Sequence, residues 1–249
     1  MLDVLDLPDI DDRLVAPETP YEILDGELIY VAPSDEPHGF RHADLCAVIG
    51  AHRGAGFRVA CDLLTRTSKT NDFAPDVSVY PSARDPRTGR RQLEHLAFEV
   101  VSTQSLGHAG RKAGKLIARG VRRVFAIDVE RERVLEWSVE LAGWSVLDPD
   151  AVIADVAFAV PLPISALLTT DPADDAVARA LVARHHPVIE ESRAHDRADA
   201  ILAVLAARGI AVPAADRARI LAEPDRDRLT RWLARAATCA RLADVLSEP

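Results

Sequence analysis

Apolar residues in the first 160 positions form short runs that are separated by turn residues, and most of these runs predict β-strands. Two runs flank Asp25-Gly26, a pair that is typical of a tight hairpin turn. The run Leu96–Val101 (LAFEVV) is continuously apolar apart from one glutamate, as in a strand that is buried on both faces. Further strands are expected at residues 57–64, 74–80, 123–128 and 133–138, the last two joined as a hairpin.

Two segments between these strands have the spacing of helices. Leu45, Val48 and Ile49 recur at helical spacing and predict a helix from His38 to about Gly50. Residues 108–119 predict a second helix, and Gly120 is expected to end it. Strands interrupted by helices indicate an α/β fold.

The pattern changes after Pro161-Leu162-Pro163, and only helical patterns follow from residue 173 to the end. These helices are expected around residues 174–185, 189–208, 214–222, 226–236 and 239–246. The sequence therefore predicts an acidic arm over 1–20, an α/β domain over 21–165 and an all-α C-terminal extension over 173–249.

Composition narrows the class of protein. The 249 residues are about half apolar (48%), which is enough for one full core. A net charge of −9 argues against constitutive nucleic-acid binding, although it allows a local basic groove. No apolar run reaches the ~18 residues of a membrane span, and the acidic start does not resemble a signal peptide. The three cysteines fit no disulfide framework, and we expect Cys46 and Cys61 in the core of a reduced, cytoplasmic protein.

Two acidic residues are the first candidates for chemistry. Glu99 lies inside LAFEVV, where a carboxylate is costly unless it is paired, protonated or bound to a metal. Asp76 opens another short apolar strand directly after Pro75. Two carboxylates on separate strands suit Mg²⁺, which prefers hard oxygen ligands. The alternative is structural: Asp76 caps a turn, and Glu99 pairs with a cation such as Arg123.

The stretch 111–123 is basic and contains no acidic residue. It carries two of the chain's three lysines, Lys112 and Lys115, which share one helix face. Its arginines are Arg111, Arg119, Arg122 and Arg123. Such a patch is typical of a surface that binds a phosphate backbone, although a solvated helix face is the plainer interpretation.

The segment Tyr21–Leu28 (YEILDGEL) resembles the YELIDGEL opening of the Uma family of putative restriction endonucleases, a bacterial branch of the PD-(D/E)XK nuclease superfamily. The resemblance continues in order over roughly residues 20–140. The further matching pieces are Pro33-Ser34 with His38, Ala74–Val79, Phe98–Thr103, Lys112 ahead of Gly120-Val121, and Arg123–Asp128.

This resemblance implies a restriction-endonuclease-like mixed sheet flanked by helices and a DNA endonuclease that depends on Mg²⁺, with Mn²⁺ as a substitute. The catalytic residues would be Asp76, Glu99 and Lys112. The metal ligands would be Asp76, Glu99 and the backbone carbonyl of Val100. The auxiliary residues would be His38 and Lys115, and the residues on the DNA backbone would be Arg111 and Arg119. The implied partners are DNA and a second copy in a homodimer, without a membrane.

Three places depart from the pattern of the family and its superfamily. Thr103-Gln104-Ser105 stands where the family has PST after the glutamate strand, and His108 stands where it often has an aspartate four residues before the helix lysine. The lysine of the superfamily's E-x-K motif would fall on Val101, two residues after Glu99 on the same strand face. A cation must therefore come from elsewhere, and the following helix can supply it: Lys112 matches the family position and Lys115 is the reserve. Two other functions stay open: an inactive nuclease-like fold that binds DNA or protein, and an interaction protein whose helical extension drives oligomerisation.

Overall fold

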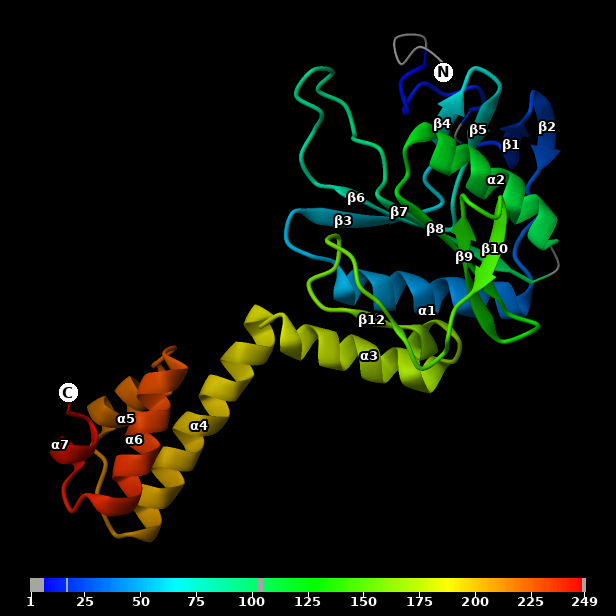
Figure 1. Ribbon diagram of the computed structural model, residues 1–249. Helices are drawn as coiled ribbons and strands as arrows, with labels where there is room; N and C mark the ends of the chain where they lie inside the picture. The colour runs from blue at the N-terminus through cyan, green and yellow to red at the C-terminus, as the bar shows by residue number, and fades with distance from the viewer. Residues whose placement is uncertain (1–6, 17, 103–104, 248–249) are drawn as a thin grey trace. The chain divides into compact units, whose positions relative to one another are not determined.

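The computed structural model describes residues 7–16, 18–102 and 105–247 (Figure 1). Part of the predicted acidic arm and two residues of the family-like segment after Glu99, Thr103 and Gln104, lie outside the described residues. The chain divides into two compact units, Met1–Ala180 and Leu181–Pro249.

A six-stranded mixed sheet forms the centre of the first unit. Its strands, in spatial order, are β10 (Gly143–Val146), β9 (Arg133–Ser138), β8 (Arg123–Asp128), β7 (Leu96–Val101), β6 (Val77–Pro81) and β3 (Phe57–Cys61). β7 and β8 run parallel and every other neighbouring pair is antiparallel. Parallel strands need a crossover connection, and the helix α2 (Leu106–Arg119) supplies it. The predicted α/β class is therefore confirmed.

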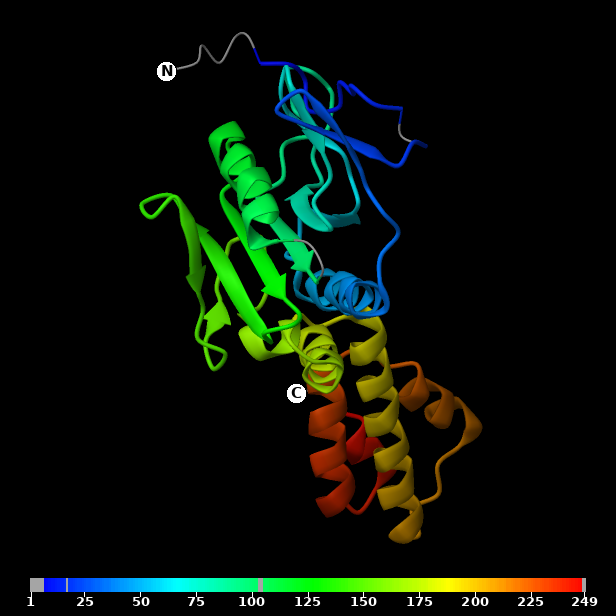
Figure 2. The same ribbon diagram turned by 90° about the vertical axis from the view of Figure 1, so that its right-hand side faces the viewer.

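Helices cover both faces of this sheet (Figures 1 and 2). Successive side chains of a strand point to opposite faces. Accordingly, Phe98 of β7 packs in the cluster that contains Ile49 of the helix α1 (Glu36–His52), whereas its neighbour Ala97 packs with Leu116 of α2. The even-numbered positions of β7 thus face α1, and the odd-numbered positions, Glu99 among them, face α2.

A second sheet lies in the same unit, in the order β2 (Glu27–Tyr30), β1 (Tyr21–Leu24), β5 (Asn71–Phe73) and β4 (Thr65–Ser68). The predicted hairpin turn is present, with Asp25 and Gly26 at φ 57° and 84°. β4 and β5 were not predicted, because their sequence is mostly polar. They are buried because polar partners meet them: Arg66 of β4 donates to the backbone carbonyl of Asp12 at 2.9 Å.

The last elements of the first unit are short or helical. They are β11 (Val152–Ile153), β12 (Leu162–Pro163), the 3₁₀ helix η2 (Ile164–Leu167) and α3 (Thr170–Ala183). Ala173 and Ala176 of α3 are buried in the same core cluster as Phe98 of the central sheet. The helical pattern predicted from residue 173 onward therefore begins with a helix that packs on the α/β core.

The second unit is entirely helical in its described part. It contains α4 (Pro187–Ala207), α5 (Ala214–Leu221), α6 (Arg226–Thr238) and α7 (Leu242–Val245). Its own core surrounds the fully buried Trp232, with Ile201, Leu205 and Leu229 packed in the same cluster. Among the described residues, no helix of either unit combines the length and the apolar character that crossing a bilayer requires.

A glycine makes the close packing of α2 on the β9–β10 hairpin achievable. A Cβ at Gly110 would lie 2.9 Å from a ring carbon of Trp137 and 3.3 Å from the indole nitrogen of Trp144. At Gly114, one turn on, the nearest such contact is an ordinary 3.6 Å. We expect Gly110→Ala to lower the free energy of unfolding by about 1–3 kcal/mol through overpacking.

The matched control is Gly114→Ala, which is expected to raise stability by up to about 1 kcal/mol because alanine favours the helix. Urea unfolding of both variants measures the difference. Equal effects of the two substitutions would contradict the packing argument.

Candidate active site

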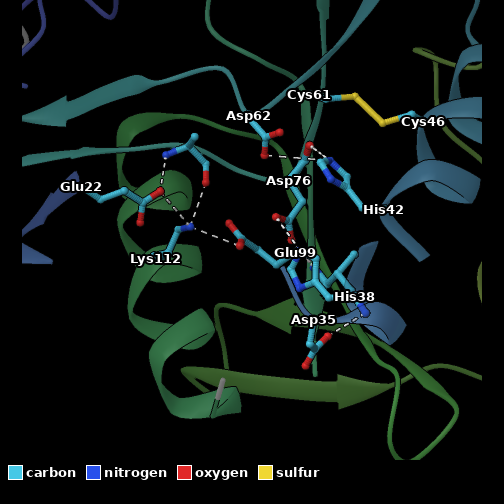
Figure 3. A network of polar contacts seen from close by, with 12 residues as sticks. Glu22, Asp35, His38, His42, Cys46, Cys61, Asp62, Asp76, Glu99 and Lys112 are labelled. Carbon is cyan, nitrogen blue, oxygen red and sulfur yellow. Dashed lines mark hydrogen bonds and ion pairs between the residues drawn. A yellow bond between two sulfur atoms is a disulfide. The ribbon is translucent and has the colours of Figure 1, made fainter. Parts of the chain in front are cut away.

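Strand register places the two predicted carboxylates opposite each other. β6 and β7 pair Val77 with Phe98, so the next pair toward the strand end is Asp76 with Glu99. Residues directly opposite in an antiparallel pair project from the same face. Asp76 lies against β7, because its Oδ2 accepts a hydrogen bond from the backbone N–H of Val100 at 2.5 Å. Both carboxylates consequently meet at the α2 side of the sheet (Figure 3).

Lys112 reaches these acids from α2. Its ammonium nitrogen lies 3.2 Å from Oε2 of Glu99 and 3.4 Å from Oε1 of Glu22, and it donates to the backbone carbonyl of Ala74 at 2.8 Å. The residue is only 5% exposed. The sheet and the following helix therefore bring Asp76, Glu99 and Lys112 together, as the sequence predicts, and the hairpin strand β1 adds Glu22 (Figure 3).

Several carboxylates surround the single ammonium group of Lys112, and this excess of negative charge influences the pKa values of Glu99 and Lys112. Burial raises the pKa of Glu99 to about 8; the charges of Asp76 and Glu22 act in the same direction and that of Lys112 acts against it. Burial alone would lower the pKa of Lys112, but the charges of Glu99 and Glu22 outweigh it and raise the pKa. Lys112 therefore stays charged at neutral pH, and it is suited to be a cation rather than a proton acceptor.

His38 of α1 lies on the other side of Asp76. Its Nε2 is 3.4 Å from Oδ1 of Asp76, and this contact makes the largest contribution to raising the pKa of His38. Burial pushes the pKa of Asp76 upward, yet the hydrogen bond with His38, the charge of Lys112 and the N–H of Val100 together leave it lowered. Asp76 is therefore ionised at neutral pH, whereas Glu99 keeps a proton more readily.

The site offers a buried acceptor that no protein group uses. Oε1 of Glu99 is buried and has no hydrogen-bond partner in the described part of the chain. A buried carboxylate oxygen without a partner is costly unless a proton or cation meets it. Glu99 lines a cavity of about 570 Å³ together with Asp76, Lys112, His38 and His108. Oxygen ligands beside an open cavity fit a hard divalent cation such as Mg²⁺.

The other predicted basic residues have partners of their own. Lys115 forms an ion pair with Asp25 in the hairpin turn, so Lys112 rather than Lys115 meets the buried acids. Arg119 donates to the backbone carbonyl of Pro8 at 2.6 Å. Arg111 is exposed, and its guanidinium lies 3.4 Å from the ring nitrogen Nδ1 of His108. Several basic side chains of the stretch 111–123 therefore already have protein partners, so fewer of them are available to DNA than the sequence suggests.

The structural alternative named Arg123 as an ion-pair partner for Glu99, and this prediction is wrong. Arg123 pairs with Glu136 of β9 through two hydrogen bonds of 2.6 and 2.9 Å. Glu99 pairs with Lys112 instead; in the strand register Glu99 lies opposite Ala126, and Arg123 lies opposite Leu96, three residues away along β8.

Three neighbours of this site were not singled out from the sequence. Glu22 accepts a hydrogen bond from the N–H of Ala74 at 2.7 Å, and His42 lies one helical turn after His38. Asp62 follows the last residue of β3. The family-like YEIL strand is a signal for Glu22, whereas nothing in the local sequence separates His42 or Asp62 from ordinary surface residues.

A disulfide joins Cys46 of α1 to Cys61 of β3, so the expectation that these cysteines are unpaired is wrong. Cys46 packs partly buried against the core but Cys61 is exposed, so the expectation of a core position is wrong for Cys61. Fifteen residues separate them in sequence, and the Cα atoms lie 6.9 Å apart because α1 packs on β3. Spacing along the chain cannot reveal such a pair, since the distance between the thiols depends on the packing of a helix on a strand. Cys239 is the free cysteine of the described residues.

A thiol count checks this pairing. Denatured protein prepared without reductant is expected to expose one thiol per chain, from Cys239, and three after reduction, from all the cysteines. Colorimetric titration with a disulfide reagent in denaturant measures both numbers. Three thiols in the unreduced sample would show that Cys46 and Cys61 are not joined.

A buried Asp–Glu–Lys cluster at the end of paired strands in a helix-flanked mixed sheet defines a restriction-endonuclease-like protein. The Uma2 family model, described as "Putative restriction endonuclease", matches residues 3–152, and the chain belongs to this family. No curated protein matches the chain.

Solved structures also match. One is described as a putative nuclease belonging to DUF820 from Anabaena variabilis ATCC 29413. It has 20% sequence identity to this chain, covers 66% of it and 94% of its own length, and gives a TM-score of 0.49.

Proposed function

We propose that this protein is an endonuclease that hydrolyses DNA phosphodiester bonds with the help of Mg²⁺, which Mn²⁺ can replace. The observation that carries the proposal is the buried, unpartnered Oε1 of Glu99, which lies in one cavity with Asp76 and the charged Lys112. Among the described residues, Glu94 and Asp72 also each have a buried carboxylate oxygen without a partner, but neither lines this cavity, whereas Glu99 shares it with a second carboxylate and an ammonium group. Membership of a family described as restriction endonucleases supports the same reaction class.

The carboxylates of Asp76 and Glu99, together with the backbone carbonyl of Val100, would hold the cation. A bound Mg²⁺ offsets negative charge at a phosphodiester and lowers the pKa of a water molecule. Asp76 is held for this role from two sides, by the N–H of Val100 at 2.5 Å and by His38 at 3.4 Å. Glu99 has to be ionised, so cation binding displaces any proton that its raised pKa retains.

Lys112 supplies the fixed positive charge. Its contacts with Glu99 and with the carbonyl of Ala74 hold the ammonium in place before substrate arrives. A preorganised cation stabilises charge that develops on the scissile phosphate without reorganisation of solvent. Because its pKa is raised, Lys112 binds and orients the phosphate or the attacking water and does not take a proton from it.

The exposed Arg111 is our candidate for contact with the DNA backbone. Arg119 and Lys115 would be secondary contacts, which require that Arg119 break its hydrogen bond to Pro8 and Lys115 its ion pair with Asp25. A net charge of −9 means that such contacts must be local, and DNA binding is expected to weaken steeply with salt. A homodimer would allow both strands to be cut, one by each copy.

A plasmid-cleavage assay tests the function. Purified protein with Mg²⁺ or Mn²⁺ is expected to convert supercoiled plasmid into nicked and linear forms, and EDTA is expected to abolish the conversion. The wild-type protein and a preparation of Asp76→Asn, purified identically, are compared so that a contaminating nuclease is detected. Absence of cleavage with both ions, or equal cleavage by Asp76→Asn, would reject the enzyme and favour an inactive binding module.

A further inference from the structure

The side of Asp76 that faces α1 carries a second group of metal-ligating side chains, of which the proposed Mg²⁺ site uses only Asp76 itself. His42, Asp62 and Asp76 each offer one ligand atom, and these three atoms lie within 4.8 Å of one another. His42 projects from α1, and Asp62 follows the end of β3 (Figure 3). All three line the same cavity as Glu99 and Lys112.

All three ligand atoms lie within 4.8 Å of one another, and the spacing of His42 and Asp62 is that of two ligands around one ion. Two ligand atoms that each lie ~2.1 Å from an ion are separated by about 3.0 Å at a right angle and about 4.2 Å on opposite sides. Nε2 of His42 is 3.9 Å from Oδ1 of Asp62. Nε2 of His38 is 3.4 Å from Oδ1 of Asp76, so a second imidazole is available at the edge of the group.

Backbone and covalent restraints hold this group in place. His42 precedes Cys46 by one helical turn, and Asp62 directly follows Cys61, so the Cys46–Cys61 disulfide links the two elements that carry His42 and Asp62. Nε2 of His42 also lies 2.8 Å from the backbone oxygen of Asp76, which brings the ring against the Asp76 segment. An ion would take this nitrogen in place of that hydrogen bond.

From this geometry we infer that Asp76 bridges two cation sites, and that the second site binds a borderline transition ion of the Co²⁺ or Zn²⁺ type through His42, Asp62 and Asp76. The ligand chemistry separates the two sites. Imidazole nitrogen suits Zn²⁺ and its transition-metal neighbours, whereas sites built from carboxylate, carbonyl and water suit Mg²⁺. The inference rests on the proposed function, because the first of the two sites is the proposed Mg²⁺ site of Asp76 and Glu99.

Metal binding in the absence of DNA tests the second site without any measurement of cleavage. The full-length protein, without reductant, is dialysed against Co²⁺ in a large excess of Mg²⁺, and bound cobalt is counted by mass spectrometry. Wild type is expected to retain one Co²⁺ per chain, with an absorption spectrum of nitrogen and oxygen ligation. Glu99→Gln, which removes a ligand of the Mg²⁺ site only, is expected to retain it as well.

Asp62→Asn is the decisive variant, because it removes a carboxylate at an exposed position. The Asp62 side chain is 68% exposed, and its φ of 51° is one that asparagine adopts readily, so this variant is expected to fold. We expect its affinity for Co²⁺ to fall at least about tenfold, and that of His42→Ala likewise.

The matched control is the pair His195 and Asp199 on α4, whose Nε2 and Oδ2 atoms lie 3.5 Å apart but are solvent-exposed. Replacing Asp199 by asparagine is expected to leave cobalt binding unchanged. Retention of Co²⁺ by Asp62→Asn, failure of wild type to bind Co²⁺ beside Mg²⁺, or a thiolate charge-transfer band would each overturn the second site. A protein that binds cobalt as expected but does not cut DNA would reject only the proposed nuclease function.

Discussion

Replacing Glu99 by glutamine is expected to lower metal-dependent plasmid cleavage by about 10²–10³-fold or more, which is the effect of removing one preorganised electrostatic group from an active site. Glutamine keeps the shape of the side chain and an oxygen that can accept from Lys112. It cannot supply the negative charge that the proposed cation requires at the buried Oε1 position. The fold is therefore expected to survive while the reaction is lost, and initial rates of nicking at saturating Mg²⁺ measure the change.

Glu140 provides the matched control for this substitution. It is a glutamate that lies exposed on the same α/β unit, where Glu140→Gln is expected to leave the nicking rate unchanged. If Glu99→Gln and Glu140→Gln cut plasmid at the same rate, Glu99 holds no catalytic cation and its burial serves the fold alone.

Replacing Lys112 by methionine is expected to destabilise the protein by about 3–5 kcal/mol, as when one partner of a buried ion pair is removed. The substitution keeps much of the apolar stem but leaves Glu99 and Glu22 buried without their cation. Urea or thermal unfolding of the metal-free protein measures the loss. Lys115→Met on the same helix is the control, and a cost of at most about 1 kcal/mol is expected because Lys115 and Asp25 are partly exposed to solvent.

A double substitution separates charge from packing. In Glu99→Gln with Lys112→Met, one of the stranded buried carboxylates is removed together with the ammonium. We expect it to recover part of the stability that Lys112→Met loses, because less uncompensated charge is buried. Additive losses in the double variant would show that lost packing, rather than unpaired charge, explains the effect of Lys112.

Helices and strands could be predicted from the sequence where the interactions that stabilise them are between residues close together in the chain. The strand Leu96–Val101 has the predicted bounds, and the second helix ends before Gly120 as expected. Both could be predicted because the burial pattern of a strand and the cap of a helix depend on residues that are neighbours in sequence. β4 and β5 escaped prediction because their buried polar residues have partners that are distant in sequence: Arg66 donates to the backbone carbonyl of Asp12, and Oδ2 of Asp72 accepts from the N–H of Leu14.

The same distinction applies to the site. A carboxylate inside an apolar strand is a local anomaly, and therefore Glu99 could be identified without coordinates. Lys112 followed from a family pattern and from the absence of a cation at Val101. His42 and Asp62 lie near the site only because α1 and the end of β3 both pack close to Asp76. The spacing of these residues along the chain does not reveal that packing.

By itself, the sequence determined the α/β class, the helical C-terminal region and three residues of the candidate site, Asp76, Glu99 and Lys112. The class, the helical region and the two carboxylates follow from periodicity and from charge in apolar surroundings, which are properties of short segments, whereas Lys112 follows from the resemblance to the family. Only the tertiary structure decided that Glu22 joins Lys112, that Cys46 pairs with Cys61, and that several basic residues of 111–123 already have partners. The physical reason is that ion pairs, disulfides and ligand groups depend on distances between elements, and folding sets those distances through the packing of all the elements together.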